Sequence, residues 1–187
     1  MPRSPLAFPT ALFLFALAST VARAEETPSL QGPWVGVTLS TSSAFDAGIR
    51  EPGLNQSTVE YGGSVGLGVR AGYDFLSFAG AYAELQADIH YTSFGGGLRL
   101  MTPTRTLRAG LTAGLRFLPE NPTLPFFTAG LLAEVRPWEH LGFGLEVGRA
   151  WPLKDEVTRD QQGSTPQRTL TLDEGPLRVL AGLTWYF

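Results

Sequence analysis

Side chains along most of this chain alternate between apolar and polar or small, with a period of two residues. In Ala79 to Tyr91 every second residue is apolar, and the positions between them include Glu84, Gln86 and Asp88. A period of two places alternate side chains on opposite faces of a β-strand, whereas an amphipathic helix repeats about every 3.6 residues. The sequence therefore predicts an all-β protein whose strands each have one apolar face and one polar face.

Seven segments show this pattern clearly, and a weaker segment brings the count to eight. The seven are Trp34 to Ser40, Val59 to Tyr73, Ala79 to Tyr91, Thr106 to Leu118, Pro125 to Arg136, Leu141 to Trp151 and Val179 to Phe187. An antiparallel barrel with both ends on one side of a membrane needs an even number of strands, so Gly96 to Thr102 is predicted to be the eighth. If that segment is a loop, the alternatives are a six-stranded barrel or a larger, differently paired one.

The final segment indicates where such a barrel lies in the cell. Its apolar face consists of Val179, Ala181, Leu183, Trp185 and Phe187. An apolar face that stops at an aromatic belt is typical of a strand that meets lipid. The sequence thus favours an antiparallel up-and-down transmembrane β-barrel in the cell outer membrane. A soluble lipocalin-like barrel, with its apolar face inside, would show the same alternation, but the aromatic strand ends argue against it.

The first 24 residues have the three parts of a secretory signal peptide. Arg3 is a positive n-region, Leu6 to Ala18 is an apolar h-region, and Ala22 to Ala24 is an A-x-A cleavage site. Cleavage there would start the mature chain at Glu25 and leave residues 25–187 as one outer-membrane β-barrel domain. The alternative is a retained membrane anchor, but the apolar run is shorter than the ~20 residues that a spanning helix needs.

Composition excludes several classes of function. The chain has no cysteine, so a lipoprotein acylation site, a disulfide and a thiolate nucleophile are all excluded. Removing Arg3 and Arg23 from the 14 basic residues leaves 12 against 17 acidic ones, a formal net charge of −5. A nucleic-acid-binding surface would need a basic patch, so no nucleic acid is expected as a partner.

The polar faces of the strands carry equal numbers of acidic residues and arginines. They are Glu60, Asp74, Glu84, Asp88, Glu134 and Glu146, with Arg70, Arg99, Arg108, Arg116, Arg136 and Arg178. Eight strands enclose a space that side chains just fill, and charges kept from water persist only when they are paired. We therefore expect a charge-paired lumen that plugs the barrel. A narrow or gated channel for small solutes through the same residues is the alternative. Glycines on the same face of Val59 to Tyr73 would leave space for long arginines or for water.

Two long connections are the expected sites of surface interaction. They are Thr41 to Ser57 and Pro152 to Gly175, whereas the turns at Asp74 to Ser77 and Pro137 to His140 are short. Short turns of such barrels lie in the periplasm, which places the long connections outside. Acidic residues in the second long connection are interpreted as a solvated surface rather than a cation site; they are Asp155, Glu156 and Asp160.

Aromatic residues mark both ends of the predicted strands, as expected of girdles at the two membrane interfaces. The periplasmic set is Trp34, Tyr73, Phe75, Phe78, Trp138, Trp185 and Phe187, and the outer set is Tyr91, Phe94, Phe117, Phe126, Phe127 and Trp151. Arg149 has lipid-facing parity near the outer set. It would contact a lipopolysaccharide phosphate or stay solvated at the rim.

The whole mature chain resembles the small outer-membrane β-barrel superfamily of Gram-negative bacteria that includes OmpA-type and OmpX-type domains. The resemblance rests on the signal peptide, the alternation, the terminal strand that ends at Phe187, and Pro125 to Gly130, which is similar to the Pro-Tyr-x-x-Ala-Gly strand opening of that superfamily. It implies that periplasmic chaperones and the barrel assembly machinery are partners during biogenesis, with the apolar face of the terminal strand as their signal. It also implies contact with outer-membrane lipid and lipopolysaccharide.

Some small outer-membrane barrels are lipid A deacylases or palmitoyl transferases, so the two histidines are the candidates for a catalytic base. His90 and Thr92 resemble the deacylase His-x-Ser pair, with threonine in place of serine. His90 has inward rather than lipid-facing parity and spacing identifies no third residue, so an enzyme that modifies lipid A is the less favoured alternative. His140 lies in a turn, and the two histidines lack metal-ligand spacing. The sequence therefore assigns no catalytic, cofactor or metal residue, and it favours a structural or surface-interaction role through the loops.

Overall fold

A computed structural model of the chain describes residues 30–50, 57–119, 123–154, 156–159, 168–172 and 175–187. The predicted signal peptide and the start of the mature chain at Glu25 lie outside these residues, so both stay predictions.

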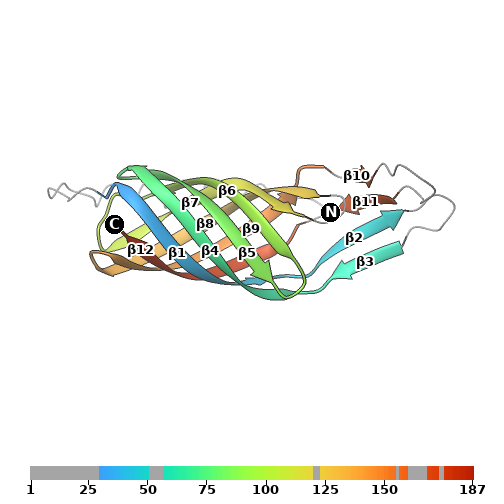
Figure 1. Cartoon of the computed structure of the whole chain (residues 1–187), viewed down its shortest axis with the longest axis horizontal. Helices are drawn as coiled ribbons and strands as arrows, with labels where there is room; N and C mark the ends of the chain where they lie inside the picture. The colour runs from blue at the N-terminus through green and yellow to red at the C-terminus, as the bar shows by residue number, and fades with distance from the viewer. Residues whose placement is uncertain (1–29, 51–56, 120–122, 155, 160–167, 173–174) are drawn as a thin grey trace, which may run out of the picture.

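Eight strands form a closed antiparallel barrel (Figure 1). They are β1 (Gly32–Ser42), β4 (Ser64–Leu76), β5 (Ala79–Asp88), β6 (Thr92–Met101), β7 (Leu107–Leu118), β8 (Leu124–Trp138), β9 (Leu141–Pro152) and β12 (Leu177–Tyr186). Each barrel strand pairs with the next one along the chain, and β12 closes the barrel against β1, with Val37 opposite Leu183. The prediction of an eight-stranded up-and-down barrel is confirmed. Its weakest strand, predicted over Gly96 to Thr102, corresponds to β6, which starts at Thr92 and ends at Met101.

The described parts of the two long connections form four strands of a second sheet. Its strands are β2 (Phe45–Arg50), β3 (Ser57–Tyr61), β10 (Glu156–Arg159) and β11 (Arg168–Leu172), in the order β10–β11–β2–β3. The sheet extends beyond one end of the barrel (Figure 1). Thr41 to Ser57 and Pro152 to Gly175 were predicted to be loops, and this is corrected where β2, β10 and β11 lie: the pairing of β11 with β2 joins two connections that are distant in the sequence. The side chains of Asp155, Glu156 and Asp160 lie outside the described residues.

The segment Val59 to Tyr73 is divided, which corrects its prediction as one strand. Gly62 and Gly63 separate β3, in the second sheet, from β4, in the barrel. A glycine pair weakens a strand and favours such a break. Glu60 therefore lies on β3, opposite Asp46, and its assignment to the barrel lumen was wrong. The side chain of Glu60 is outside the described part of the chain.

The barrel is apolar outside and polar inside, the reverse of a soluble protein. Burial alternates strictly along β1, where Val35, Val37 and Leu39 are exposed and the residues between them are buried or partly buried. Leu67, at 68% exposure, and Leu131, at 63%, continue the apolar exterior. Exposed leucines outside and buried arginines inside fit a barrel surrounded by lipid and argue against a lipocalin-like one. Among the residues that the structure describes, no helix is long and apolar enough to cross a membrane.

The ends of the barrel differ in their connections. Short turns at Ser77 and Phe78 and at Glu139 and His140 lie at the end where β12 finishes, and the second sheet lies at the other. Because short turns of transmembrane barrels of this type face the periplasm, we refer to these as the periplasmic end and the outer end.

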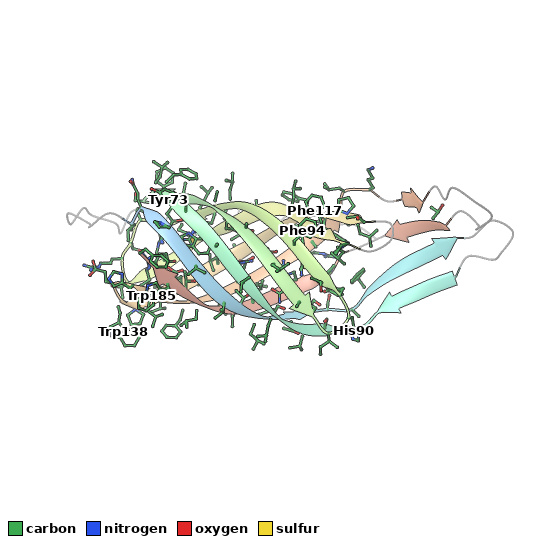
Figure 2. The ribbon with its side chains drawn as sticks, viewed as in Figure 1. Tyr73, His90, Phe94, Phe117, Trp138 and Trp185 are labelled. Atoms are coloured by element: carbon green, nitrogen blue, oxygen red, sulfur yellow. The ribbon has the colours of Figure 1, made fainter. Side chains whose placement is uncertain are left out.

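Exposed aromatic side chains gather at both ends of the barrel. Figure 2 shows Tyr73, Trp138 and Trp185 near the periplasmic end, and Phe94 and Phe117 near the outer end. Three members of the predicted girdles point inward instead: Trp34, Tyr91 and Phe126, with exposures of 4%, 7% and 1%. Trp34 and Phe126 have the parity of the polar face of their strands, whereas Tyr91 lies in the connection between β5 and β6, where strand parity no longer applies. These three side chains line the barrel interior.

Candidate functional site

Buried charges fill the barrel interior, and Asp74 is the most enclosed carboxylate at the periplasmic end. It is 1% exposed and accepts two hydrogen bonds from Arg99, at 2.8 Å from Nε and 2.5 Å from Nη2. Arg108 Nη1 lies 3.5 Å from Oδ2 of the same carboxylate. A bidentate pair with one guanidinium and the proximity of a second one offset much of the free energy lost when this carboxylate is removed from water.

Glu134 is the second carboxylate at this end, and it is also shared. Its Oε1 lies 3.9 Å from Arg108 Nη1 and 3.4 Å from Arg136 Nε, and its Oε2 accepts a hydrogen bond from the Tyr186 hydroxyl at 2.5 Å. We call these residues the periplasmic cluster: Asp74, Arg99, Arg108, Glu134, Arg136 and Tyr186. The cluster has three arginines and two carboxylates, so it carries an excess of positive charge.

Two arginines of the periplasmic cluster lie over the faces of aromatic rings. The Arg99 guanidinium carbon lies 3.9 Å from the ring centroid of Trp34, and that of Arg136 lies 3.1 Å from the centroid of Tyr186. Such stacking attracts a cation to the ring face. The two rings were absent from the sequence-based network, although both residues have the inward parity that would have identified them.

A second group, the central cluster, consists of Arg70, Glu84, Glu146, Arg178 and Thr112. Arg70 donates to Glu84 Oε2 from Nε and Nη2, at 3.0 and 2.7 Å, and to Glu146 Oε2 from Nη1, at 2.6 Å. Arg178 donates to the other oxygen of Glu84 at 3.2 Å. Arg70 and Glu84 are direct cross-strand partners on β4 and β5, so the register of the sheet brings them together. Two arginines face two carboxylates here, and the cluster is neutral.

The outer cluster links one ion pair to several neutral polar groups. Arg116 lies 3.3 Å from Asp88 Oδ2 and donates to the Ser93 hydroxyl at 2.7 Å. Asp88 also accepts a hydrogen bond from Ser40 at 3.0 Å, and the Gln86 amide donates to Ser40 at 2.5 Å. Ser40, Gln86 and Ser93 were absent from the sequence-based network, although they share the inward parity of the charged residues.

Inward glycines leave room for these side chains. A Cβ on Gly72 would overlap the indole of Trp34, one on Gly80 would overlap the Asp74 carboxylate, and one on Gly66 would overlap Asp88. The glycines of β4 were predicted to leave space for long arginines or for water, and these contacts involve neither. The space beside the three glycines is occupied by an indole from β1 and by short carboxylates from β4 and β5.

An apolar group covers the polar interior at its outer end. We call it the apolar cap; it consists of the buried residues Phe45, Tyr91, Leu118, Leu124, Phe126 and Ala150. Phe45 and Phe126 meet edge to face, with ring centroids 6.4 Å apart. Phe45 is the first residue of β2, so the second sheet contributes one side chain to the closure of the barrel. A void of about 10 Å³ lies between the cap and Arg116.

Between the periplasmic and central clusters the lumen retains a cavity of about 40 Å³, lined by Trp34, Arg70, Tyr82, Arg99, Glu134 and Glu146 among others. The Trp34 indole nitrogen and Glu134 Oε1 are buried without a hydrogen-bond partner in the described structure. A volume of this size holds a few water molecules. Trp34 and Glu134 both line this cavity.

The remaining predicted residues lie away from the interior. His90 is exposed in the turn after β5, which ends at Asp88, so the inward parity assigned to His90 was wrong. His140 stacks on Trp185, with centroids 5.9 Å apart, and its Nδ1 lies 3.0 Å from the Tyr186 carbonyl oxygen. Arg149 is partly exposed on β9. Within the described ranges, no three His, Asp or Glu residues are grouped as a metal site would require.

A closed antiparallel barrel with an apolar exterior and a charged interior defines an integral outer-membrane β-barrel, and this chain has the fold of the small eight-stranded members of that class. The N-terminal β-barrel domain of Pseudomonas aeruginosa OprF aligns with 84% of this chain and 99% of its own, with a TM-score of 0.51 and 12% sequence identity. At that identity the likeness concerns the fold alone.

Two further solved structures align over a similar extent with lower scores. Neisserial surface protein A covers 82% of this chain and 97% of its own, with a TM-score of 0.42 and 10% identity. Ail, the attachment invasion locus protein of Yersinia pestis, covers 83% of this chain and 99% of its own, with a TM-score of 0.40 and 10% identity. No protein-family model matches the chain. No curated protein matches it either.

Proposed function

We propose that this protein is a closed outer-membrane barrel that passes no solute and that presents its second sheet outside the cell, in a structural or surface-interaction role. The observation that carries the proposal is the filled lumen: three polar clusters follow one another along the barrel, and the apolar cap covers the outermost. A solute that crossed the barrel would have to displace both the ion pairs of the clusters and the apolar contacts of the cap.

Opening the central cluster would be costly. Arg70 and Glu84 have side-chain exposures of 10% and 6%, so separating them leaves two charges in an interior with little water. Breaking a buried pair by removing one partner typically costs ~3–5 kcal/mol. A closed lumen is therefore the stable state of the barrel.

The second sheet is the part of the protein that suits contact with other molecules. Its outer strands, β10 and β3, each pair on one side only within the described sheet, and the sheet extends past the barrel (Figure 1). Binding residues of rigid scaffolds are commonly placed on such projecting segments. The rigid barrel would anchor the sheet in the membrane.

The experiment replaces residues 156–172 with a short turn, which removes β10 and β11 from the second sheet. Cells that carry the variant or the wild type, at equal outer-membrane levels, are compared for aggregation with one another and for adhesion to glass and to glycan-coated surfaces. A surface-interaction role predicts that the variant loses at least one of these activities. Unchanged aggregation and adhesion would overturn that role and leave the structural one.

A small-solute channel is the second candidate, and the cavity of about 40 Å³ between the periplasmic and central clusters favours it. Water in that cavity would be part of a conducting path only if the apolar cap and the outer cluster also opened. The channel therefore requires a second conformation, whereas the closed barrel requires none.

A further inference from the structure

A pocket at the periplasmic rim joins the charged interior to the lipid-facing surface. It has a volume of about 100 Å³, and its walls come from the start of β1 and the residues before it, the end of β8, the turns after β6 and β8, and the end of β12. Three side chains that differ in character line it: Arg136 from the periplasmic cluster, Arg105 from the turn after β6, and Trp138, which is 62% exposed on the outer surface. Two arginines and an exposed indole therefore line the pocket, together with one acidic side chain, Glu139.

Arg136 is the residue that makes this pocket suitable for an anion. Its side chain is 6% exposed, and its Nε has no hydrogen-bond partner although it lies 3.4 Å from Glu134 Oε1. The same oxygen also faces Arg108 at 3.9 Å, so one carboxylate serves two guanidinium groups. The Arg136 guanidinium carbon lies over the Tyr186 ring, 3.1 Å from its centroid, and this contact holds the group in place. A fixed, incompletely compensated guanidinium is well suited to bind two oxygens of an oxyanion.

A second hydrogen-bond donor for an anion in this pocket is Arg105. Arg105 is half exposed and lies 3.5 Å from Glu139, which is 64% exposed. Such exposed pairs contribute little stability, so an incoming anion competes with Glu139 for Arg105 at low cost. His140 adds a ring nitrogen to the lining.

We propose that this pocket binds the phosphate of an anionic phospholipid from the inner leaflet of the outer membrane. Free phosphate offers the same oxygens, but the pocket opens toward the surface where Trp138 and Phe187 are 62% and 70% exposed. Aromatic side chains at this level mark the membrane interface, where headgroups lie. An acyl chain would continue from the pocket along the exposed aromatic surface, which free phosphate cannot use.

The test measures lipid retention by native mass spectrometry of the refolded mature protein, after equilibration with equal amounts of phosphatidylglycerol and phosphatidylcholine. The wild type is expected to retain one phosphatidylglycerol in preference to phosphatidylcholine. Each of Arg105→Gln and Arg136→Gln should weaken that retention by about fivefold, the contribution of one basic side chain near an anionic surface. Glu139→Gln should strengthen it, because Arg105 loses its competing partner.

Lys154→Gln is the matched control, since Lys154 is exposed at the outer end of the barrel; its lipid retention should equal that of the wild type. Arg105→Gln removes an exposed side chain and tests the pocket even if Arg136→Gln does not fold. Equal retention of the two lipids, or retention that neither arginine variant lowers, would overturn the proposal. Binding of inorganic phosphate without preference for phosphatidylglycerol would overturn the assignment to a lipid headgroup.

Discussion

Asp74 is the carboxylate on which two buried arginines depend, so its charge is predicted to be essential for the stability of the barrel. Asp74→Asn keeps the size of the side chain but leaves Arg99 and Arg108 facing a neutral amide. We expect a loss of ~3–5 kcal/mol in the free energy of unfolding, as when one member of a buried ion pair is removed. Urea-induced unfolding of the refolded protein, followed by tryptophan fluorescence, measures the change.

Glu139→Gln is the control for this prediction, because it removes an ion pair of which both members are exposed. Its cost should be at most ~1 kcal/mol. If Asp74→Asn were as stable as Glu139→Gln, Asp74 would not compensate for the buried arginines.

Gly72 is predicted to be required for the position of Trp34. Its missing side chain leaves the space that the Trp34 indole occupies beneath Arg99. Gly72→Val should therefore destabilise the barrel by ~1–3 kcal/mol, the usual cost of overpacking. Trp34→Ala in the same chain should recover part of that loss. Ala71→Val, one residue away on the exposed face, should unfold at the same urea concentration as the wild type, and a loss equal to that of Gly72→Val would disprove the steric explanation.

At the scale of elements, the sequence was enough to predict the number of barrel strands and which of their side chains point inward. It was not enough to predict that the two long connections pair with each other. Alternation alone placed Arg70, Glu84 and Arg116 on the inner face, because inward and outward positions follow from parity. It gave no sign that β2 pairs with β11, since that contact depends on two segments far apart in the chain. Phe45 was missed for the same reason: it follows a predicted strand, and only the folded connection brings it over the lumen.

Phe45 is expected to couple the second sheet to the barrel. Phe45→Ala removes its edge-to-face contact with Phe126 and the apolar cap loses a large side chain, so the second sheet should open locally more often. Hydrogen exchange of the β2 and β11 amides is predicted to become faster, while exchange in β7 and β8 stays as in the wild type. Phe143→Ala, on the exposed surface of β9, should leave both regions unchanged. Equal protection of the second sheet in Phe45→Ala and wild type would contradict the coupling.

At the scale of the whole molecule, Phe187 is predicted to serve assembly rather than stability. Its side chain is 70% exposed, and its backbone nitrogen donates to the Pro33 carbonyl oxygen at 3.2 Å. Phe187→Ala should reduce the amount of barrel in the outer membrane and leave the unfolding of protein refolded in detergent unchanged. Leu177→Ala, at the other end of β12, is the control for membrane levels. Normal membrane levels of Phe187→Ala would contradict the role of the terminal face, which also includes Val179, Ala181, Leu183 and Trp185, as an assembly signal.

The proposed closure of the lumen depends on all three clusters and the apolar cap together, and ion conductance tests it most directly. Refolded protein that migrates faster in gels before heating than after is inserted into planar bilayers, and single-channel currents are recorded for the wild type, Glu84→Ala and Arg116→Ala. The closed barrel predicts that the wild type inserts and passes no current. Reproducible current steps from the wild type, changed in size by either substitution, would contradict a closed lumen and establish a path through the charged interior.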